Sequence, residues 1–272
     1  MNSKSTILFL LLGPMFFLSA CSPKPYAASE KLYKQQLKAY IKTLKQMKPT
    51  PIDSDPASSL WVPTTNFNLR KPNYVILHHT AQDSVAQTLK TFTLQKSQVS
   101  AHYVVAKDGK VYHMLNDYLR AWHAGVAKWG NNTDINSMSI GIELDNNGAQ
   151  PFTDAQINSL LLLLKTLKKT YNIPTSNFIG HADIAPKRKP DPNEFFPWKT
   201  LAEKGYGLWY DKVLETPPAE FNPFEALHVI GYDTSDINAA LVAFKRHFIQ
   251  NDLRPIVTES DKAILYNLYK KY

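Results

Sequence analysis

The sequence predicts an α/β fold in which helices flank a mixed central β-sheet, followed by a small module of three helices. Between Trp61 and Tyr210, short β-rich runs alternate with a long amphipathic helix, and an Asp-Gly turn joins two of the runs. After the break at Pro217-Pro218, only helical periodicity remains. We therefore expect a sheet domain over residues 61–212 and a helical module over residues 213–272.

The segment that precedes the sheet domain, residues 21–60, is expected to hold one amphipathic helix and a linker. Apolar residues recur at helical spacing from Glu30 to Met47, and prolines after Met47 mark the linker. Seven lysines stand against only three acidic residues here, so the segment carries half of the net charge of +8. We interpret this charge as that of a solvated helix, with lipid head groups or acidic wall polymers as candidate weak partners.

Five short runs are expected to form the sheet. An apolar run leads into His78-His79, and Asp108-Gly109 stands between two β-rich runs. This Asp-Gly pair predicts a hairpin in which both turn residues take positive φ. The predicted strands are Tyr74–Leu77, Ala101–Ala106, Val111–Leu115, Met138–Leu144 and Phe178–Ile179.

Four helices are predicted after the fourth strand run and in the C-terminal module. Thr153 with Gln156 forms a capping-box pattern that opens a helix with one apolar stripe. In the module, Pro223 suits the first turn of a helix and Gly231 suits its end. Two more helices follow from apolar spacing over 237–248 and 264–269. A module this small has few core residues, so we expect it to pack against the larger domain.

Composition and motifs exclude several classes of protein. Hydrophobic residues make up 44% of the chain and charged residues 20%, which excludes a disordered or fibrous protein. A single cysteine excludes an internal disulfide framework and an all-cysteine metal site. GxSxG, Walker A, Rossmann and HExxH patterns are absent from the sequence. No nucleic-acid-binding motif accompanies the positive charge, so we expect no nucleic-acid partner.

The first residues resemble a bacterial lipoprotein signal. An apolar run that ends at Leu18 is too short to span a bilayer, which is typical of a signal peptide. Leu18-Ser19-Ala20-Cys21 is similar to a lipobox, in which the signal is cut before the cysteine and the thiol is lipidated. The resemblance implies a signal peptide at residues 1–20 and membrane anchoring through lipid on Cys21. Because Ser22 follows, it implies an outer-membrane lipoprotein that faces the periplasm.

Candidate metal ligands stand at the ends of two predicted strands. His78 ends a buried run, and its neighbour His79 points to the opposite face because side chains alternate along a strand. His181 opens a proline-rich loop that also carries Asp191. Two histidines and one carboxylate form a zinc set that leaves the fourth position to water or substrate.

Two further residues suit the chemistry of such a site. Glu143 shares a strand face with Ser139 and Gly141, so it is either the floor of a cleft or an exposed residue of a half-buried strand. In a cleft, a glutamate can take a proton from water. Lys189 stands two positions before the loop aspartate, where a lysine can stabilise an oxyanion.

Five motifs, in this order and spacing, resemble the zinc-dependent N-acetylmuramoyl-L-alanine amidases. The resemblance covers most of the chain from Trp61 to Tyr210. Its motifs are Val75-Ile76-Leu77-His78-His79-Thr80-Ala81, Ser100-Ala101-His102-Tyr103, Ala121-Trp122-His123-Ala124-Gly125, Ser139-Ile140-Gly141-Ile142-Glu143-Leu144 and His181-Ala182-Asp183-Ile184-Ala185-Pro186.

The resemblance implies a fold like that of peptidoglycan recognition domains, with Zn²⁺ as cofactor and peptidoglycan or muropeptides as partners. It matches His78, His181 and Asp191 to the zinc ligands. It also matches Glu143 to the catalytic acid/base and Lys189 to the lysine that assists at the transition state. The implied reaction cuts the amide between the lactyl group of N-acetylmuramic acid and L-alanine of the stem peptide.

Three more residues in the motifs are candidates for lining the substrate site: His102, His123 and Trp122. His102 is equally suited to packing inside its strand, and a core position is favoured for Trp122. In the C-terminal module, Gly231-Tyr232-Asp233 is the best local cue for peptidoglycan binding; the alternative role is packing support.

Two other functions stay open at this point. A non-catalytic peptidoglycan-binding lipoprotein would share the fold, but members that only bind typically lose a metal ligand, and this sequence keeps all three. A hydrolase of another bond, such as a peptide bond of the stem, would share the chemistry. We expect the protein to be a monomer.

Overall fold

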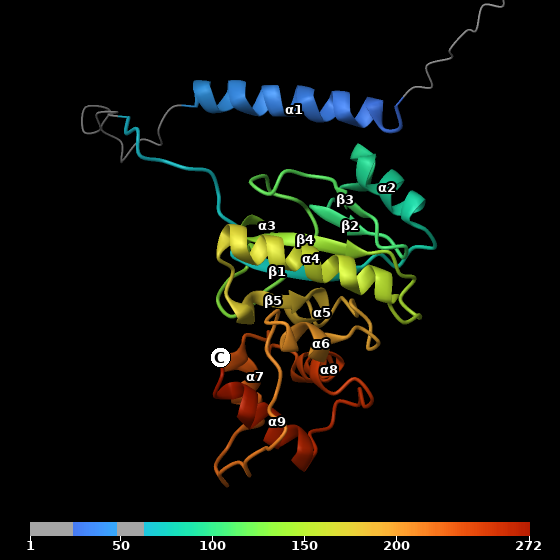
Figure 1. The fold of residues 1–272 in the computed structure, drawn as a ribbon. Coiled ribbons are helices and arrows are strands. Elements are labelled where there is room, and N and C mark those ends of the chain that lie inside the picture. Colours follow the sequence, from blue (N-terminus) through green and yellow to red (C-terminus); the bar gives the residue numbers. More distant parts are fainter. Residues whose placement is uncertain (1–23, 48–62) are drawn as a thin grey trace, which may run out of the picture. The chain divides into compact units, whose positions relative to one another are not determined.

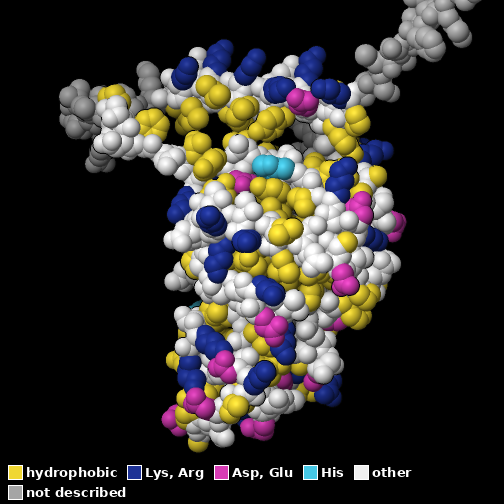
Figure 2. Space-filling view, in the orientation of Figure 1, with side chains coloured by type: hydrophobic (Ala, Val, Ile, Leu, Met, Phe, Trp, Pro, Cys, Tyr) yellow, Lys and Arg dark blue, Asp and Glu magenta, His cyan; other side chains and the backbone are white. Residues whose placement is uncertain are grey.

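The computed structural model describes residues 24–47 and 63–272 (Figure 1). The chain divides into two compact units, residues 1–60 and residues 61–272. In the first unit, helix α1 (Ala27–Gln46) confirms the predicted amphipathic helix, and none of its residues is buried. Figure 2 shows lysines along one side of α1 and apolar side chains along the other. The predicted signal peptide, Cys21 and most of the linker lie outside the described residues. None of the described helices is long and apolar enough to cross a membrane.

The second unit is built on a five-stranded mixed sheet with strand order β3-β2-β4-β1-β5, which confirms the predicted fold class. β1 pairs in parallel with β4 and β5, β2 pairs in parallel with β4, and only the β2–β3 hairpin is antiparallel. The carboxyl ends of β1, β4 and β5 therefore meet at one edge, where α/β sheets bind ligands. The strands are β1 Tyr74–His79, β2 Tyr103–Val105, β3 Val111–His113, β4 Ser139–Leu144 and β5 Phe178–Gly180.

Helices lie on both faces of this sheet (Figure 1). Four of these helices, α2, α3, α5 and α6, were not predicted, and α5 occupies the start of a segment that was predicted to be a loop. Two of them, α3 and α5, are each 4 residues long, which is too short to show helical periodicity. The helices are α2 Val85–Thr93, α3 Ile135–Met138, α4 Asp154–Tyr171, α5 His181–Ile184, α6 Trp198–Glu203, α7 Pro223–Ile230, α8 Ile237–Phe248 and α9 Glu259–Tyr269, with 3₁₀ turns at Gln95–Ser97 and Thr175–Asn177.

The long helix α4 covers one face of the sheet. Its buried Leu160 and Leu164 belong to one apolar cluster with Ile140, Ile142 and Leu144 of β4. This confirms the predicted alternation along β4 and leaves the opposite face of that strand to Gly141 and Glu143. Thr153 caps α4 as predicted by accepting a hydrogen bond from the backbone of Gln156 at 3.2 Å.

The opposite face of the sheet is covered by α5 and the C-terminal helices. Ile76 of β1 and Ile179 of β5 share one apolar cluster with Leu227, Phe244 and Leu265 of α7, α8 and α9. The three helices thus complete their core with residues of the sheet domain, as their small size predicts. The division of this unit at residue 212 stays a prediction.

Two local predictions were wrong in detail. The hairpin forms, but only Gly109 takes positive φ, at 86°, while the Asp108 carboxylate accepts a hydrogen bond from the Lys110 N–H at 2.9 Å. Gln156 does not complete a capping box, because its side chain donates to the Val105 carbonyl oxygen at 2.8 Å. That bond fastens the start of α4 to the sheet instead.

Candidate active site

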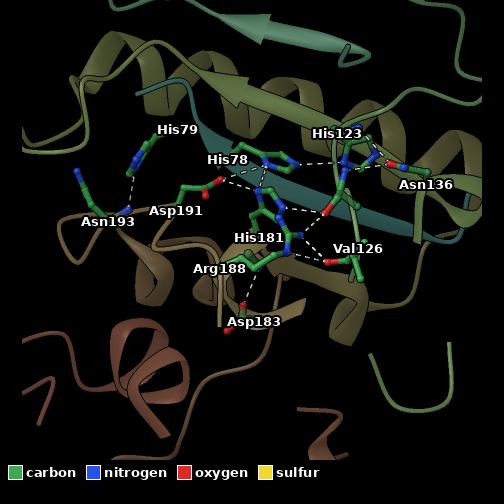
Figure 3. A network of polar contacts seen from close by, with 12 residues as sticks. His78, His79, His123, Val126, Asn136, His181, Asp183, Arg188, Asp191 and Asn193 are labelled. Atoms are coloured by element: carbon green, nitrogen blue, oxygen red, sulfur yellow. Dashed lines mark hydrogen bonds and ion pairs between the residues drawn. The ribbon is translucent and has the colours of Figure 1, made fainter. Parts of the chain in front are cut away.

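Three side chains that are far apart in sequence converge at the carboxyl edge of the sheet. His78 comes from β1, His181 is the first residue of α5 directly after β5, and Asp191 lies in the loop that follows (Figure 3). All three are buried, and one donor atom from each lies within 4.8 Å of the others. His78 Nδ1 and His181 Nδ1 are 2.9 Å apart and lie 3.2 and 3.0 Å from Asp191 Oδ2.

The hydrogen bonds on the far sides of the rings show that this cluster suits a metal ion. His181 Nε2 lies 3.0 Å from the Ala124 carbonyl oxygen, which can only accept, so Nε2 carries the proton and Nδ1 presents a lone pair to the cluster. Two imidazole nitrogens and one carboxylate oxygen are ligands that zinc accepts, and such a set leaves one position open.

A second chain of contacts orients His78. Its Nε2 lies 3.1 Å from His123 Nδ1, and His123 Nε2 lies 3.2 Å from Ser139 Oγ. The Ser139 hydroxyl donates to the Ile135 carbonyl oxygen at 2.6 Å, so it accepts from His123. His123 Nδ1 is then free to accept from His78 Nε2–H, which leaves the lone pair of His78 Nδ1 for the cluster.

His123 itself is held in a narrow space behind His78. The Asn136 side-chain oxygen accepts from the backbone N–H groups of His123 and Ala124 at 3.1 and 2.9 Å. Gly141 of β4 provides the room, because a Cβ atom there would lie 2.4 Å from the His123 ring. The structure therefore places His123, a candidate lining residue, beneath a predicted metal ligand.

The protonation states of the cluster suit metal binding. Burial, followed by the neighbouring His181, lowers the pKa of His78 to about 4, so the ring is neutral near pH 7. Burial raises the pKa of Asp191, but the close contacts with His181 and His78 outweigh it and hold this pKa below its usual range. A neutral imidazole and an ionised carboxylate are the forms that bind metals.

Glu143 lies next to this cluster, opposite His78 in the β1–β4 register. Its side chain is half-buried, and its Oε2 atom is shielded from solvent without a hydrogen-bond partner in residues 24–47 and 63–272. Burial, and then the charge of Asp191, raises the pKa of Glu143 to about 8, while Lys189 acts in the opposite direction. A carboxyl group whose pKa lies near neutral can both take and return a proton.

Lys189 lies in a loop that is fastened to the segment around Ala124 and Val126. The loop's Arg188 donates from its guanidinium to the carbonyl oxygens of Ala124 and Val126 (Figure 3). The Lys189 side chain is half-buried, and its charge acts on both Glu143 and His78. The structure thus places the predicted lysine within electrostatic reach of the predicted acid/base.

The other candidate residues lie elsewhere. His79 points away from the cluster, as strand alternation predicts, and accepts from the Asn193 N–H at 3.1 Å (Figure 3). His102 is fully enclosed, accepts from the Gly141 N–H at 3.0 Å and lies 3.0 Å from the Leu119 carbonyl oxygen. Trp122 is 44% exposed, so the favoured core position was wrong and its indole is open to contacts. Cys21 lies outside the described residues.

Sequence reasoning gave no role to Asn136, Arg188 and Asp183, which hold the segments that carry the site. Each bonds to groups distant in the chain; the Asp183 side chain, for example, bonds to Tyr232, which is 49 positions away. Asp183 stands inside the motif His181–Pro186, and its place there is the one sequence signal that pointed to it.

A histidine–histidine–carboxylate cluster that could hold a metal ion lies beside the half-buried Glu143, at the carboxyl edge of a mixed sheet. This arrangement is typical of metal-dependent hydrolases. The family model for N-acetylmuramoyl-L-alanine amidase matches residues 68–194. N-acetylmuramoyl-L-alanine amidase AmiD of Escherichia coli is 34% identical over 230 residues, which cover 73% of this chain and 82% of the relative. The chain belongs to the N-acetylmuramoyl-L-alanine amidase family.

Solved structures share this architecture. The complex of Escherichia coli AmiD with anhydro-N-acetylmuramic acid-L-Ala-D-γ-Glu-L-Lys has a TM-score of 0.67 and 31% identity, and the match covers 78% of this chain and 93% of AmiD. AMPDH3 from Pseudomonas aeruginosa has a TM-score of 0.68 and 29% identity, with 82% of this chain and 99% of that chain covered. Both matches extend beyond residues 68–194, which are less than half of this chain.

Proposed function

We propose that the protein is a zinc-dependent amidase that hydrolyses the bond between N-acetylmuramic acid and the L-alanine of the stem peptide, in peptidoglycan or in muropeptides. The convergence of His78, His181 and Asp191 beside the unpartnered Oε2 of Glu143 is the observation that carries this proposal. The substrate class follows from the family and from the muropeptide bound to the AmiD structure.

The residues of the chain divide the work of amide hydrolysis between them. A zinc ion, when bound by the three ligands, supplies a Lewis acid beside Glu143. Glu143 Oε2 takes a proton from the attacking water and returns it to the nitrogen of the departing L-alanine. The Lys189 ammonium group stabilises the negative charge that develops on the carbonyl oxygen. His123 keeps the His78 ring in the orientation that binding requires.

We also propose that the mature protein is a monomer anchored by lipid on Cys21 to the outer membrane, facing the periplasm. The lipobox-like Leu18-Ser19-Ala20-Cys21 supports the anchor. Labelling of the protein by a radioactive fatty acid in cells, abolished by Cys21→Ala, is the expected result. Persistence of the label in that variant would contradict the proposal.

Product masses test the reaction most directly. The chain from Ser22 onward is incubated with anhydro-N-acetylmuramic acid-L-Ala-D-γ-Glu-L-Lys, with and without a zinc chelator. We expect free peptide that begins with L-Ala, lost with the chelator and restored by added zinc. Shorter stem fragments would indicate a peptidase instead. An intact substrate with zinc bound would favour the binding lipoprotein. The complete ligand set and the shielded Oε2 of Glu143 argue against that alternative.

A further inference from the structure

Asp183 sits at the junction that presents His181 to the metal cluster. The residue is 2% exposed, and its Oδ2 accepts from the backbone N–H of Gly180 at 2.7 Å. Gly180 ends β5 and His181 begins α5, so this bond closes the chain around the metal ligand. The Asp183 carboxylate lies on the side away from the three ligands (Figure 3).

The same carboxylate receives two bonds from the C-terminal helices. Tyr232, which follows α7, donates from its hydroxyl to Asp183 Oδ1 at 2.8 Å. His247 of α8 places Nδ1 2.8 Å from Asp183 Oδ2. Burial, followed by the Asp183 charge, raises the pKa of Tyr232 well above its ordinary value, so the phenol keeps its proton and donates. Both side chains are buried, at 1% and 3% exposure.

Each donor is fixed by aromatic packing. The His247 ring is stacked between Trp198 and Phe248, with centroids 3.8 and 4.1 Å away. Tyr232 packs edge-on against Trp129 at 5.1 Å. Because the packing prevents both donors from moving, their hydrogen bonds hold the Asp183 carboxylate in one position.

Gly231 and Tyr232, two of the three residues in the best local cue for peptidoglycan binding (Gly231-Tyr232-Asp233), face inward. A Cβ atom at Gly231 would lie 2.5 Å from the Trp129 ring, and the Gly231 carbonyl oxygen accepts from Gly130 N–H at 2.7 Å. The close approach of Trp129 therefore requires a glycine at position 231, and the Tyr232 hydroxyl is already bonded to Asp183. Neither residue is open to a wall polymer.

We infer that Tyr232 and His247 are positioning residues, through which the C-terminal helices hold Asp183 and thereby set the orientation of the metal ligand His181. The module then acts as part of the active site without touching the substrate. This inference rests on the proposed function, because it needs His181 to bind zinc.

The chain offers a matched control for its own test. Tyr171 donates to Asp117 Oδ2 at 2.8 Å, the same distance as between Tyr232 and Asp183, and it too is buried. Tyr232→Phe and Tyr171→Phe each delete one buried phenol–carboxylate bond. Both variants should lower the thermal midpoint, but only Tyr232→Phe should weaken zinc binding, by about 10-fold in competition with a chelator.

Cobalt substitution adds a readout that a general loss of stability does not change. We expect the d–d absorption bands of the Co²⁺-loaded protein to shift in Tyr232→Phe and to stay unchanged in Tyr171→Phe. At His247, asparagine retains a donor near the Nδ1 position whereas leucine has the same size without it. Zinc affinity should therefore be higher in His247→Asn than in His247→Leu.

Equal zinc affinities and unchanged cobalt spectra across these variants would show that the module only packs, and would overturn the inference. A different result would contradict the proposed function itself: failure of the unaltered full chain to bind zinc or to cleave the muropeptide. The two failures are distinguished because the second appears before any substitution is made.

Discussion

At the scale of single residues, the proposed function assigns metal binding and proton transfer to different groups. Glu143 is outside the set of three converging donors, and its buried Oε2 has no hydrogen-bond partner in the described part of the chain. An unpaired buried carboxyl group is costly, so its presence points to use in the reaction.

Glu143→Gln keeps the size of the side chain and removes its basicity. We expect turnover to fall about 100- to 10,000-fold, because proton transfer is lost, with zinc content unchanged. Mass spectrometry of the products and metal analysis of the purified variant check the two parts. The exposed Glu220 provides the control, where the same change should leave turnover intact. Loss of zinc from Glu143→Gln would contradict the assignment.

His123 offers a pair of substitutions of equal size. Asparagine keeps an acceptor near the Nδ1 position that faces His78 Nε2 at 3.1 Å, whereas leucine has none. Zinc affinity, measured against a chelator, should fall about 10-fold further in His123→Leu than in His123→Asn. If the two variants bound zinc equally, the proposed orientation of His78 by His123 would be wrong.

His102 predicts sensitivity to acid. Burial lowers its pKa to about 4 from an ordinary value of 6.5. The unfolded chain therefore takes up a proton that the folded chain excludes, and the free energy of unfolding falls as the pH drops from 6.5 towards 4. In urea unfolding of the metal-free protein, His102→Asn should reduce this slope by up to about 1.4 kcal/mol per pH unit. The same change at the exposed His228 should not.

The sequence could predict which residues carry chemistry but not all of those that hold them in place. His78 and His181 stand in motifs that can be matched directly, and Asp191 lies in the loop that His181 opens. Asp183 receives its side-chain donors from 49 and 64 positions away, and such pairings exist only once the helices have packed. Trp122 shows the same difficulty. A tryptophan side chain is usually mostly buried, and only the folded structure shows that this one is exposed.

At the scale of elements, the strands were predictable because period-two alternation records burial directly. β4 illustrates this, since Ile140, Ile142 and Leu144 all enter the cluster under α4. The turn of the β2–β3 hairpin was less predictable, because Asp108 does not take the positive φ expected of it and its carboxylate instead accepts a hydrogen bond from the Lys110 N–H. A local side-chain bond of this kind gives the backbone an alternative turn geometry.

β4 also carries a steric requirement for the site. Gly141→Ala would place a methyl group 2.4 Å from the His123 ring and push it from its place behind His78. We expect a loss of about 1–3 kcal/mol in unfolding free energy and weaker zinc binding. Gly130→Ala is the control, because nothing lies within 4 Å of a Cβ there, so only backbone strain is added. Retention of full zinc affinity in Gly141→Ala would refute the role given to this glycine.

At the scale of the whole unit from Trp61 onward, one apolar cluster joins the sheet to α7, α8 and α9. A chain that ends at residue 212 exposes the partners of these helices, among them Ile179 and Ile184. We expect this fragment to aggregate, as size-exclusion chromatography would show, while the full chain elutes as a monomer. A soluble, zinc-binding fragment would contradict the shared core.

The wide spacing of the metal ligands along the chain has a consequence for the order of events after synthesis. His78 and His181 are 103 positions apart and come together only when β1 lies beside β5. Of the three proposed ligands, His181 and Asp191 are the two that lie close in sequence, 10 positions apart. We therefore expect tight zinc binding only after the slow long-range pairing of β1 with β5. In a refolding experiment, the rate of zinc binding would then report the rate at which the sheet is completed.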